Sequence, residues 1–129
     1  MLQQNLGGDL SQYILIPIPM YFWKKSFRGY NQSELLVKHV SKDIGVQAEY
    51  GLIRKVKKTK QQSHLSRQER IGNLEESFVV NKKLIDKYKD KTIILIDDVI
   101  STGATLNSIS TLLKQSGAHR VIGCAFASD

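Results

Sequence analysis

The chain has 129 residues, of which 41% are hydrophobic and 24% charged, and its formal net charge is +7. These values are typical of one globular domain, and we expect residues 1–129 to form it. No apolar run approaches the roughly 20 residues that span a bilayer, and no signal peptide precedes the first apolar run, so a cytoplasmic protein without membrane insertion is expected. The single cysteine, Cys124, excludes an internal disulfide and a thiolate zinc cluster, and its apolar surroundings favour a small packing residue.

The positive charge is concentrated in one stretch. Between Arg54 and Arg70 there are seven cations and one acid, Glu69. The cations are Arg54, Lys55, Lys57, Lys58, Lys60, Arg67 and Arg70, and a second basic group consists of Lys24, Lys25 and Arg28. Such local charge attracts phosphorylated small molecules or nucleic acids, and the alternative is a solvated surface with no ligand.

The first half of the chain has the pattern of a strand, a helix and a second strand. The apolar run Ile14–Pro19 predicts a buried strand leading into a loop. Asn31 and Glu34 form a capping-box pattern, and apolar residues then recur at helical spacing as far as Gly45, which predicts a helix of about three to four turns. Ala48–Val56 is typical of a second strand.

The middle of the chain gives weaker signals. Lys57–Asn73 is polar and lacks a periodic pattern. Phe78–Val80 predicts a brief strand, and Leu84–Asp90 is interpreted as a connector.

The last third has the clearest elements. Thr92–Ile96 is β-branched and apolar, as expected of a central parallel strand covered on both faces. An apolar helical face then ends near Gly117 and is followed by a strand over Arg120–Ala127; the residues of that face are Leu106, Ile109, Leu112 and Leu113. The alternation of strands and helices predicts an α/β fold, an open, mostly parallel β-sheet flanked by helices.

The segment Ile93–Thr105 carries the chemistry. Ligands of such sheets bind beyond the carboxyl ends of the strands, and here the strand leads into Asp97 and Asp98. The following turn, Ser101–Thr105, places backbone N–H groups and three hydroxyls at a helix N-terminus, which favours a phosphate. Gly103 lets the backbone approach the ligand closely. The two carboxylates can accept hydrogen bonds from sugar hydroxyls or hold the water shell of Mg²⁺.

A purely structural interpretation exists for each half of this segment. Paired acids often end a strand, and a Ser-Thr-Gly turn often caps a helix. Joined through Val99 and Ile100 after a buried strand, the two halves together favour recognition of a ribose 5-phosphate.

All thirteen positions of Ile93–Thr105 fit the phosphoribosyl pyrophosphate (PRPP) motif of the type I phosphoribosyltransferases, and the segment resembles that motif. The rest of the chain resembles the ComF/GntX-like branch of that family, which acts in bacterial DNA uptake and related pathways. The pieces that carry this resemblance are Ile16–Pro19, Arg28–Gln32, Leu52, Gln62, Leu65, Ser66, Arg70, Asn73, Phe78, Gly117 and Ala118.

The resemblance implies a role for each segment. Asp97 and Asp98 would hold the ribose hydroxyls and the metal Mg²⁺, and the implied PRPP-binding set is Asp97, Asp98, Val99, Ser101, Thr102, Gly103, Ala104 and Thr105. Arg28, Lys58 and Lys60 would lie on the pyrophosphate side. Lys57–Asn73 matches the family's mobile catalytic loop, which makes Arg67 and Arg70 catalytic candidates beside the two acids. Full-length relatives begin with a cysteine-rich, zinc-ribbon-like region, so the chain is expected to be a fragment or shortened form that lacks it.

Other residues have ordinary explanations. His64 beside Ser63 suggests nucleophilic catalysis, but no orienting acid is evident and a surface histidine is the favoured interpretation. His39 and His119 lack metal-ligand spacing and are expected in solvent. Tyr21–Trp23 before two lysines suits either stacking on single-stranded bases or burial against a neighbouring element.

Two functional hypotheses follow. The glycine-rich motifs of P-loop hydrolases and Rossmann dehydrogenases are absent, and the acidic pair lies too late in the chain for a response-regulator receiver. In the first hypothesis, the domain is a Mg²⁺-dependent enzyme that moves a phosphoribosyl group between PRPP and an acceptor. In the second, it is a binding module in DNA uptake that contacts single-stranded DNA or a helicase partner. Because dimers are frequent among relatives, a homodimer is also expected.

Overall fold

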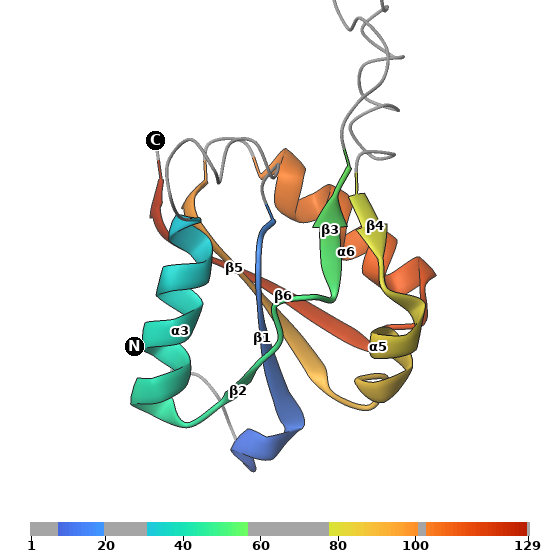
Figure 1. The fold of residues 1–129 in the computed structure, drawn as a ribbon, viewed down its shortest axis with the longest axis horizontal. Helices are drawn as coiled ribbons and strands as arrows, with labels where there is room; N and C mark the ends of the chain where they lie inside the picture. Colours follow the sequence, from blue (N-terminus) through green and yellow to red (C-terminus); the bar gives the residue numbers. More distant parts are fainter. Residues whose placement is uncertain (1–7, 20–30, 57–77, 101–102, 129) are drawn as a thin grey trace, which may run out of the picture.

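The computed structural model describes residues 8–19, 31–56, 78–100 and 103–128, and the side chains of residues 98–100 and 126–128 lie outside that description. Its elements are η1 (Leu10–Gln12), β1 (Tyr13–Pro17), α3 (Gln32–Ile44), β2 (Gln47–Ala48), β3 (Ile53–Lys55), β4 (Phe78–Val80), α5 (Lys82–Lys87), β5 (Thr92–Ile100), α6 (Ala104–Gln115) and β6 (Arg120–Ser128). Figure 1 shows their arrangement.

The described strands form one parallel sheet and one small antiparallel sheet. The parallel sheet has the order β2-β1-β5-β6, and β3 pairs with β4 in the other. In Figure 1, α3 lies on one side of the parallel sheet, and α5, α6 and the β3–β4 pair lie on the other. The predicted α/β class, with an open, mostly parallel sheet flanked by helices, is confirmed.

The central strand β5 separates two apolar cores. Ile93 and Leu95 pack with Ile109 and other residues on the side of α6, whereas Ile94 and Ile96 pack on the side of α3. All four strand residues are fully buried. Successive side chains of a strand point to opposite faces, so an uninterrupted apolar run is what a doubly covered strand requires.

The outer helices begin and end where their sequence signals predict. The Asn31 side chain accepts a hydrogen bond from the Ser33 backbone N–H at the start of α3, and Gly45 closes the helix in a left-handed conformation, with φ at 74°. At the end of α6, Gly117 has φ at 112°. Glycine adopts such values without a Cβ clash, so both helix ends are confirmed.

The segment predicted as one strand over Ala48–Val56 is two strands in different sheets. Glu49 accepts a hydrogen bond from the backbone N–H of Gly51, which turns the chain between β2 and β3. β2 pairs with β1, and β3 crosses to pair with β4. The prediction was wrong because this turn rests on a side-chain contact that the apolar pattern does not record.

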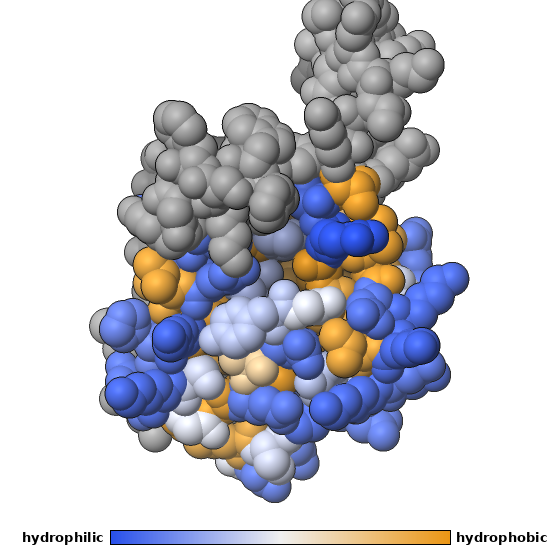
Figure 2. All heavy atoms as spheres, viewed as in Figure 1, coloured by the Kyte–Doolittle hydropathy of each residue, from blue (hydrophilic) through white to orange (hydrophobic). Residues whose placement is uncertain are grey.

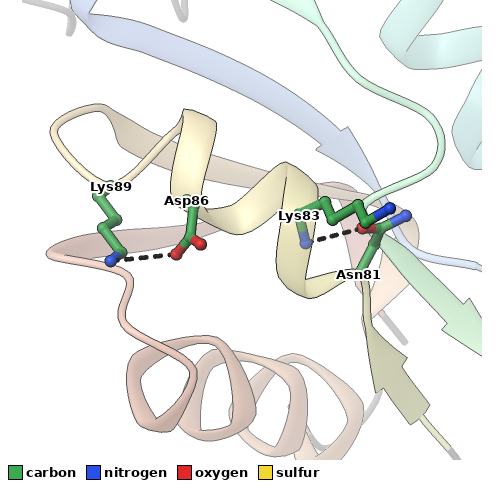
Figure 3. A network of polar contacts seen from close by, with 4 residues as sticks. All are labelled: Asn81, Lys83, Asp86 and Lys89. Carbon is green, nitrogen blue, oxygen red and sulfur yellow. Dashed lines mark hydrogen bonds and ion pairs between the residues drawn. The ribbon is translucent and has the colours of Figure 1, made fainter.

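The connector predicted over Leu84–Asp90 contains a helix, α5, that begins at Lys82. The Asn81 Oδ1 atom accepts hydrogen bonds from the backbone N–H groups of Lys83 and Leu84, at 3.0 and 3.1 Å. Figure 3 shows this cap, together with the ion pair between Lys89 and Asp86. Asparagine directly after a strand is a helix-start signal, which the prediction of a connector did not take into account.

The strand predicted over Thr92–Ile96 continues to Ile100. Its pairing with β6 extends through Asp97, opposite Ala125, and through Val99 and Ile100, opposite Ala127 and Ser128. The two acids therefore belong to the strand and do not follow it, because β6 is long enough to pair with this part of the backbone.

The surface drawn in Figure 2 is mostly hydrophilic among the described residues, with separate hydrophobic areas. The large apolar side chains exposed in the described part are Leu35, Tyr50 and Val79, which lie on three different segments.

None of the described helices has the length and apolar character required to cross a bilayer. The expected homodimer stays a prediction.

Tyr88 makes stability depend on pH. Its side chain is buried, and its hydroxyl donates a hydrogen bond to Glu49 at 2.7 Å. Burial, followed by the contact with Glu49, raises the pKa of Tyr88 from 10.0 to about 12. The unfolded chain therefore releases this proton first as the pH rises. The resulting stability is fully present below about pH 10 and is lost between about pH 10 and 12.

We expect urea unfolding to show the free energy of unfolding falling more steeply over this window in the wild type than in Tyr88→Phe. The variant is the reference because other groups that titrate at high pH contribute equally to both proteins. Parallel pH dependence in the two proteins would show that Tyr88 is not the responsible group.

Candidate ribose-phosphate site

The candidate site lies where β1 ends beside the middle of the longer strand β5. The two strands are parallel neighbours, with Pro17 opposite Ile96. The backbone N–H of Ile18 donates to the carbonyl of Ile96 at 2.9 Å, so the pairing continues to the residue after β1. This edge of a parallel sheet is where ligands bind in open α/β folds, and the next residue of β5 is Asp97.

Asp97 is half-buried and contacts the start of α3. The Ser33 hydroxyl donates to the Asp97 Oδ1 atom at 3.4 Å, although the two residues are 64 positions apart. Ser33 lies in the first turn of α3, where unpaired backbone N–H groups and the helix dipole favour negative charge. The fold therefore places a carboxylate beside the positive end of a helix.

The start of α6 supplies the second half of the site. Its N-cap is Gly103, in the left-handed conformation with φ at 79°, and Ala104 and Thr105 form the beginning of the first turn. A glycine N-cap has no side chain to accept hydrogen bonds from that turn, and the turn contains no acid. A helix N-terminus of this kind is suited to an anion such as phosphate.

The structure places only part of the predicted set. Asp97, Gly103, Ala104 and Thr105 lie at this edge, and Asp98 and Val99 are placed through the backbone of β5. The predicted residues Arg28, Lys58, Lys60, Arg67, Arg70, Ser101 and Thr102 lie outside the described residues, as do His64 and Tyr21–Trp23. Sequence reasoning missed Ser33; its only local signal was its place two residues after the capping Asn31.

The acidic side chains at this site fit a Mg²⁺ ion that is coordinated mainly by the phosphates of a bound molecule and by water. The described residues include no group of three or more histidine, cysteine or acidic side chains that could enclose a metal. Mg²⁺ commonly binds through one or two carboxylates together with substrate phosphates and water. Asp97, with Asp98 next to it in sequence, offers oxygen donors of that kind.

The structure also describes Cys124, His39 and His119. Cys124 is half-buried on β6 beside the core on the α3 side, and burial raises the pKa of its thiol, so it fits a packing residue. His39 and His119 are exposed, as expected. His119 lines a shallow polar hollow at the amino ends of β5 and β6, opposite the candidate site; its other lining residues are Lys89, Asp90, Lys114, Gly117 and Ala118.

The fold and the site together define an α/β domain with a mostly parallel sheet, in which an acid-bearing strand leads into a helix N-terminus. The family model for the phosphoribosyl transferase domain matches residues 30–129, and the chain belongs to that family.

The chain is similar to a competence protein and to DNA utilization proteins. It is 36% identical over 109 residues to competence protein F of Haemophilus influenzae, covering 83% of this chain and 46% of that protein. It is 31% identical over 121 residues to the DNA utilization protein YhgH of Salmonella typhimurium, covering 94% and 51%. The chain thus spans about half the length of these relatives. The resemblance to the ComF/GntX-like branch is confirmed, whereas the single domain and the missing zinc ribbon stay predictions.

Two further likenesses are to a ribose-phosphate pyrophosphokinase and to a solved phosphoribosyltransferase structure. Over 86 residues the chain is 37% identical to a ribose-phosphate pyrophosphokinase of Prochlorococcus marinus, covering 67% of this chain and 25% of that protein. A crystal structure of a hypoxanthine phosphoribosyltransferase from Staphylococcus aureus matches with a TM-score of 0.58 at 15% identity, covering 99% of this chain and 57% of that one. At this identity the second likeness concerns the fold alone.

Proposed function

We propose that this domain binds PRPP, or a related ribose 5-phosphate, together with Mg²⁺, and transfers a phosphoribosyl group to or from an acceptor. The observation that carries the proposal is the pairing of a carboxylate, Asp97, with a glycine-capped helix N-terminus at the end of one strand–turn–helix segment. Membership of the phosphoribosyl transferase domain family supports it.

In this proposal, different residues of the chain bind different parts of the ligand. Asp97 and Asp98 accept hydrogen bonds from the ribose hydroxyls, and the turn from Ser101 to Thr105 binds the 5-phosphate through backbone N–H groups. Mg²⁺, held by the two acids and the ligand, would offset the charge of the pyrophosphate. Arg28, Lys58 and Lys60 bind the pyrophosphate side, and Arg67 and Arg70 stabilise the negative charge that develops as it leaves.

Calorimetric titration with PRPP tests this proposal. We expect binding in the presence of Mg²⁺ and a much weaker response after chelation of the metal, because the metal offsets repulsion between the pyrophosphate and the two acids. Ribose 5-phosphate serves as the comparison ligand, since it retains the sugar and the 5-phosphate and lacks the pyrophosphate. Absence of Mg²⁺-dependent PRPP binding would rule out the proposed enzyme.

A second candidate function is binding in DNA uptake, through single-stranded DNA or a helicase partner. The names of the relatives favour it, and the basic stretch from Arg54 to Arg70 offers the charge. If it is correct, fluorescence anisotropy with a labelled oligonucleotide should show affinity falling steeply with salt, because bound cations release counterions. A flat salt response would exclude this electrostatic binding mode.

A further inference from the structure

Four hydrogen bonds connect the start of α3, through Ile18, to the middle of β5. Ile18 donates from its N–H to the carbonyl of Ile96 at 2.9 Å, and the Asn31 Nδ2 atom donates to the carbonyl of Ile18 at 3.2 Å. The Ser33 N–H donates to the Asn31 Oδ1 atom at 2.9 Å, and the Ser33 hydroxyl donates to the Asp97 carboxylate at 3.4 Å. Because Asp97 follows Ile96 in the chain, these contacts close a ring.

The ring is mostly shielded from solvent. Asn31 and Ser33 are each 4% exposed, and they are the two buried polar side chains in the described part of the chain. Both ends of the Asn31 amide are used, which fixes its orientation and with it the first turn of α3. A buried hydroxyl needs a partner, and the fixed turn aims the Ser33 hydroxyl at Asp97.

We propose that Ser33 is a positioning residue that holds the Asp97 carboxylate in the orientation required by the ribose hydroxyls. This inference rests on the proposed function and adds a residue that does not touch the ligand. Fixing a carboxylate before the ligand arrives avoids the entropy cost of ordering it on binding. The ring also couples the segment after β1 to the sugar-binding acid, since Asn31 contacts Ile18 and Ser33 contacts Asp97.

Ser33→Ala removes the hydroxyl and leaves the capping bond to Asn31, which uses the backbone N–H. We expect the affinity for PRPP with Mg²⁺ to fall by about three- to tenfold, the range for an ordinary net hydrogen bond, because Ser33 acts on the ligand only through Asp97. The affinity for inorganic pyrophosphate measured without Mg²⁺ should stay unchanged, because neither ribose nor metal then connects the ligand to Asp97. Equal losses for both ligands, or no loss for PRPP, would overturn the inference.

Ser41→Ala is the matched control. Ser41 also lies on α3, but its hydroxyl donates to the carbonyl of Val46, away from Asp97. The change should leave the affinity for PRPP within about twofold of the wild type, since this bond supports the helix end. A loss of PRPP affinity equal to that of Ser33→Ala would assign the effect to α3 in general and overturn the inference.

A double-mutant cycle separates action through Asp97 from a general effect on folding. In an Asp97→Asn background, Ser33→Ala should have no further effect on PRPP affinity, because the carboxylate it positions is gone. Ser33→Thr, which retains the hydroxyl, should restore most of the affinity, and Ser33→Cys, a weak donor of similar size, should give an intermediate value. Additive effects in the cycle, or no rescue by threonine, would overturn the inference.

The same cycle measured by urea unfolding needs no ligand. Coupling between positions 33 and 97 should make the two single changes non-additive, by the equivalent of about a threefold change in the unfolding equilibrium constant or more. Additivity there would overturn the contact itself. If the unfolding cycle shows coupling but the wild type binds no PRPP, the proposed function has failed, and the assigned role of Ser33 fails with it. Normal PRPP binding with no effect of Ser33→Ala overturns the inference alone.

Discussion

Replacing both acids of β5, in Asp97→Asn/Asp98→Asn, should lower the affinity for PRPP in the presence of Mg²⁺ by at least about 100-fold. Each carboxylate is proposed to accept hydrogen bonds from a ribose hydroxyl, and hydrogen bonds to charged groups contribute about 1.5–3 kcal/mol each. Two such hydrogen bonds contribute about 3–6 kcal/mol together. A 100-fold loss of affinity corresponds to about 2.8 kcal/mol, which is within that contribution. Calorimetry with PRPP measures the loss directly.

A matched control separates this loss from a general effect of charge. Asp43→Asn/Asp86→Asn changes the net charge equally, and both acids are exposed, Asp43 near the end of α3 and Asp86 in α5 beside Lys89. This control should keep PRPP affinity within a few-fold of the wild type, because charges at exposed positions are screened by salt. Equal affinities in the two double variants would show that the acids of β5 do not contact the ligand.

The largest expected effect on stability comes from Leu95→Ala. Leu95 is fully buried in the middle of β5 and packs in the core on the α6 side. Replacing a buried leucine with alanine costs the transfer free energy of the lost methyl groups plus the cavity they leave, about 2–5 kcal/mol in total. Because domains of this size are only marginally stable, the urea midpoint should fall sharply or the domain should fail to fold.

Val79→Ala provides the comparison on the surface of the same domain. Val79 lies in β4 and is 41% exposed, so its loss should change the free energy of unfolding by less than about 1 kcal/mol. Urea unfolding of both variants with unchanged m-values would assign the difference to stability. Similar costs at the two positions would mean that β5 is not the centre of a cooperative core.

The elements with local signals were predictable from the sequence. The cap at Asn31, the left-handed Gly45 and the buried run of β5 were all identified, because each depends on residues that are near one another in the chain. Candidate site residues could be named in the same way, since strand, acids, turn and helix follow one another between Ile93 and Thr105. Their ligand, however, was inferred by resemblance and chemistry.

Only the tertiary structure decided the contacts between distant segments. The length of β5 depends on its partner β6, and Glu49, directly after β2, accepts a hydrogen bond from the hydroxyl of Tyr88, 39 residues away. Ser33 contacts Asp97 across 64 residues because α3 begins beside the middle of β5. The spacing of apolar residues and the capping of helices depend on residues that are close in sequence. Strand register and long-range side-chain contacts depend on which strands lie next to each other in the sheet. The sequence therefore determined the acid-bearing strand and its helix, and the order of the sheet determined which side chain holds the acid.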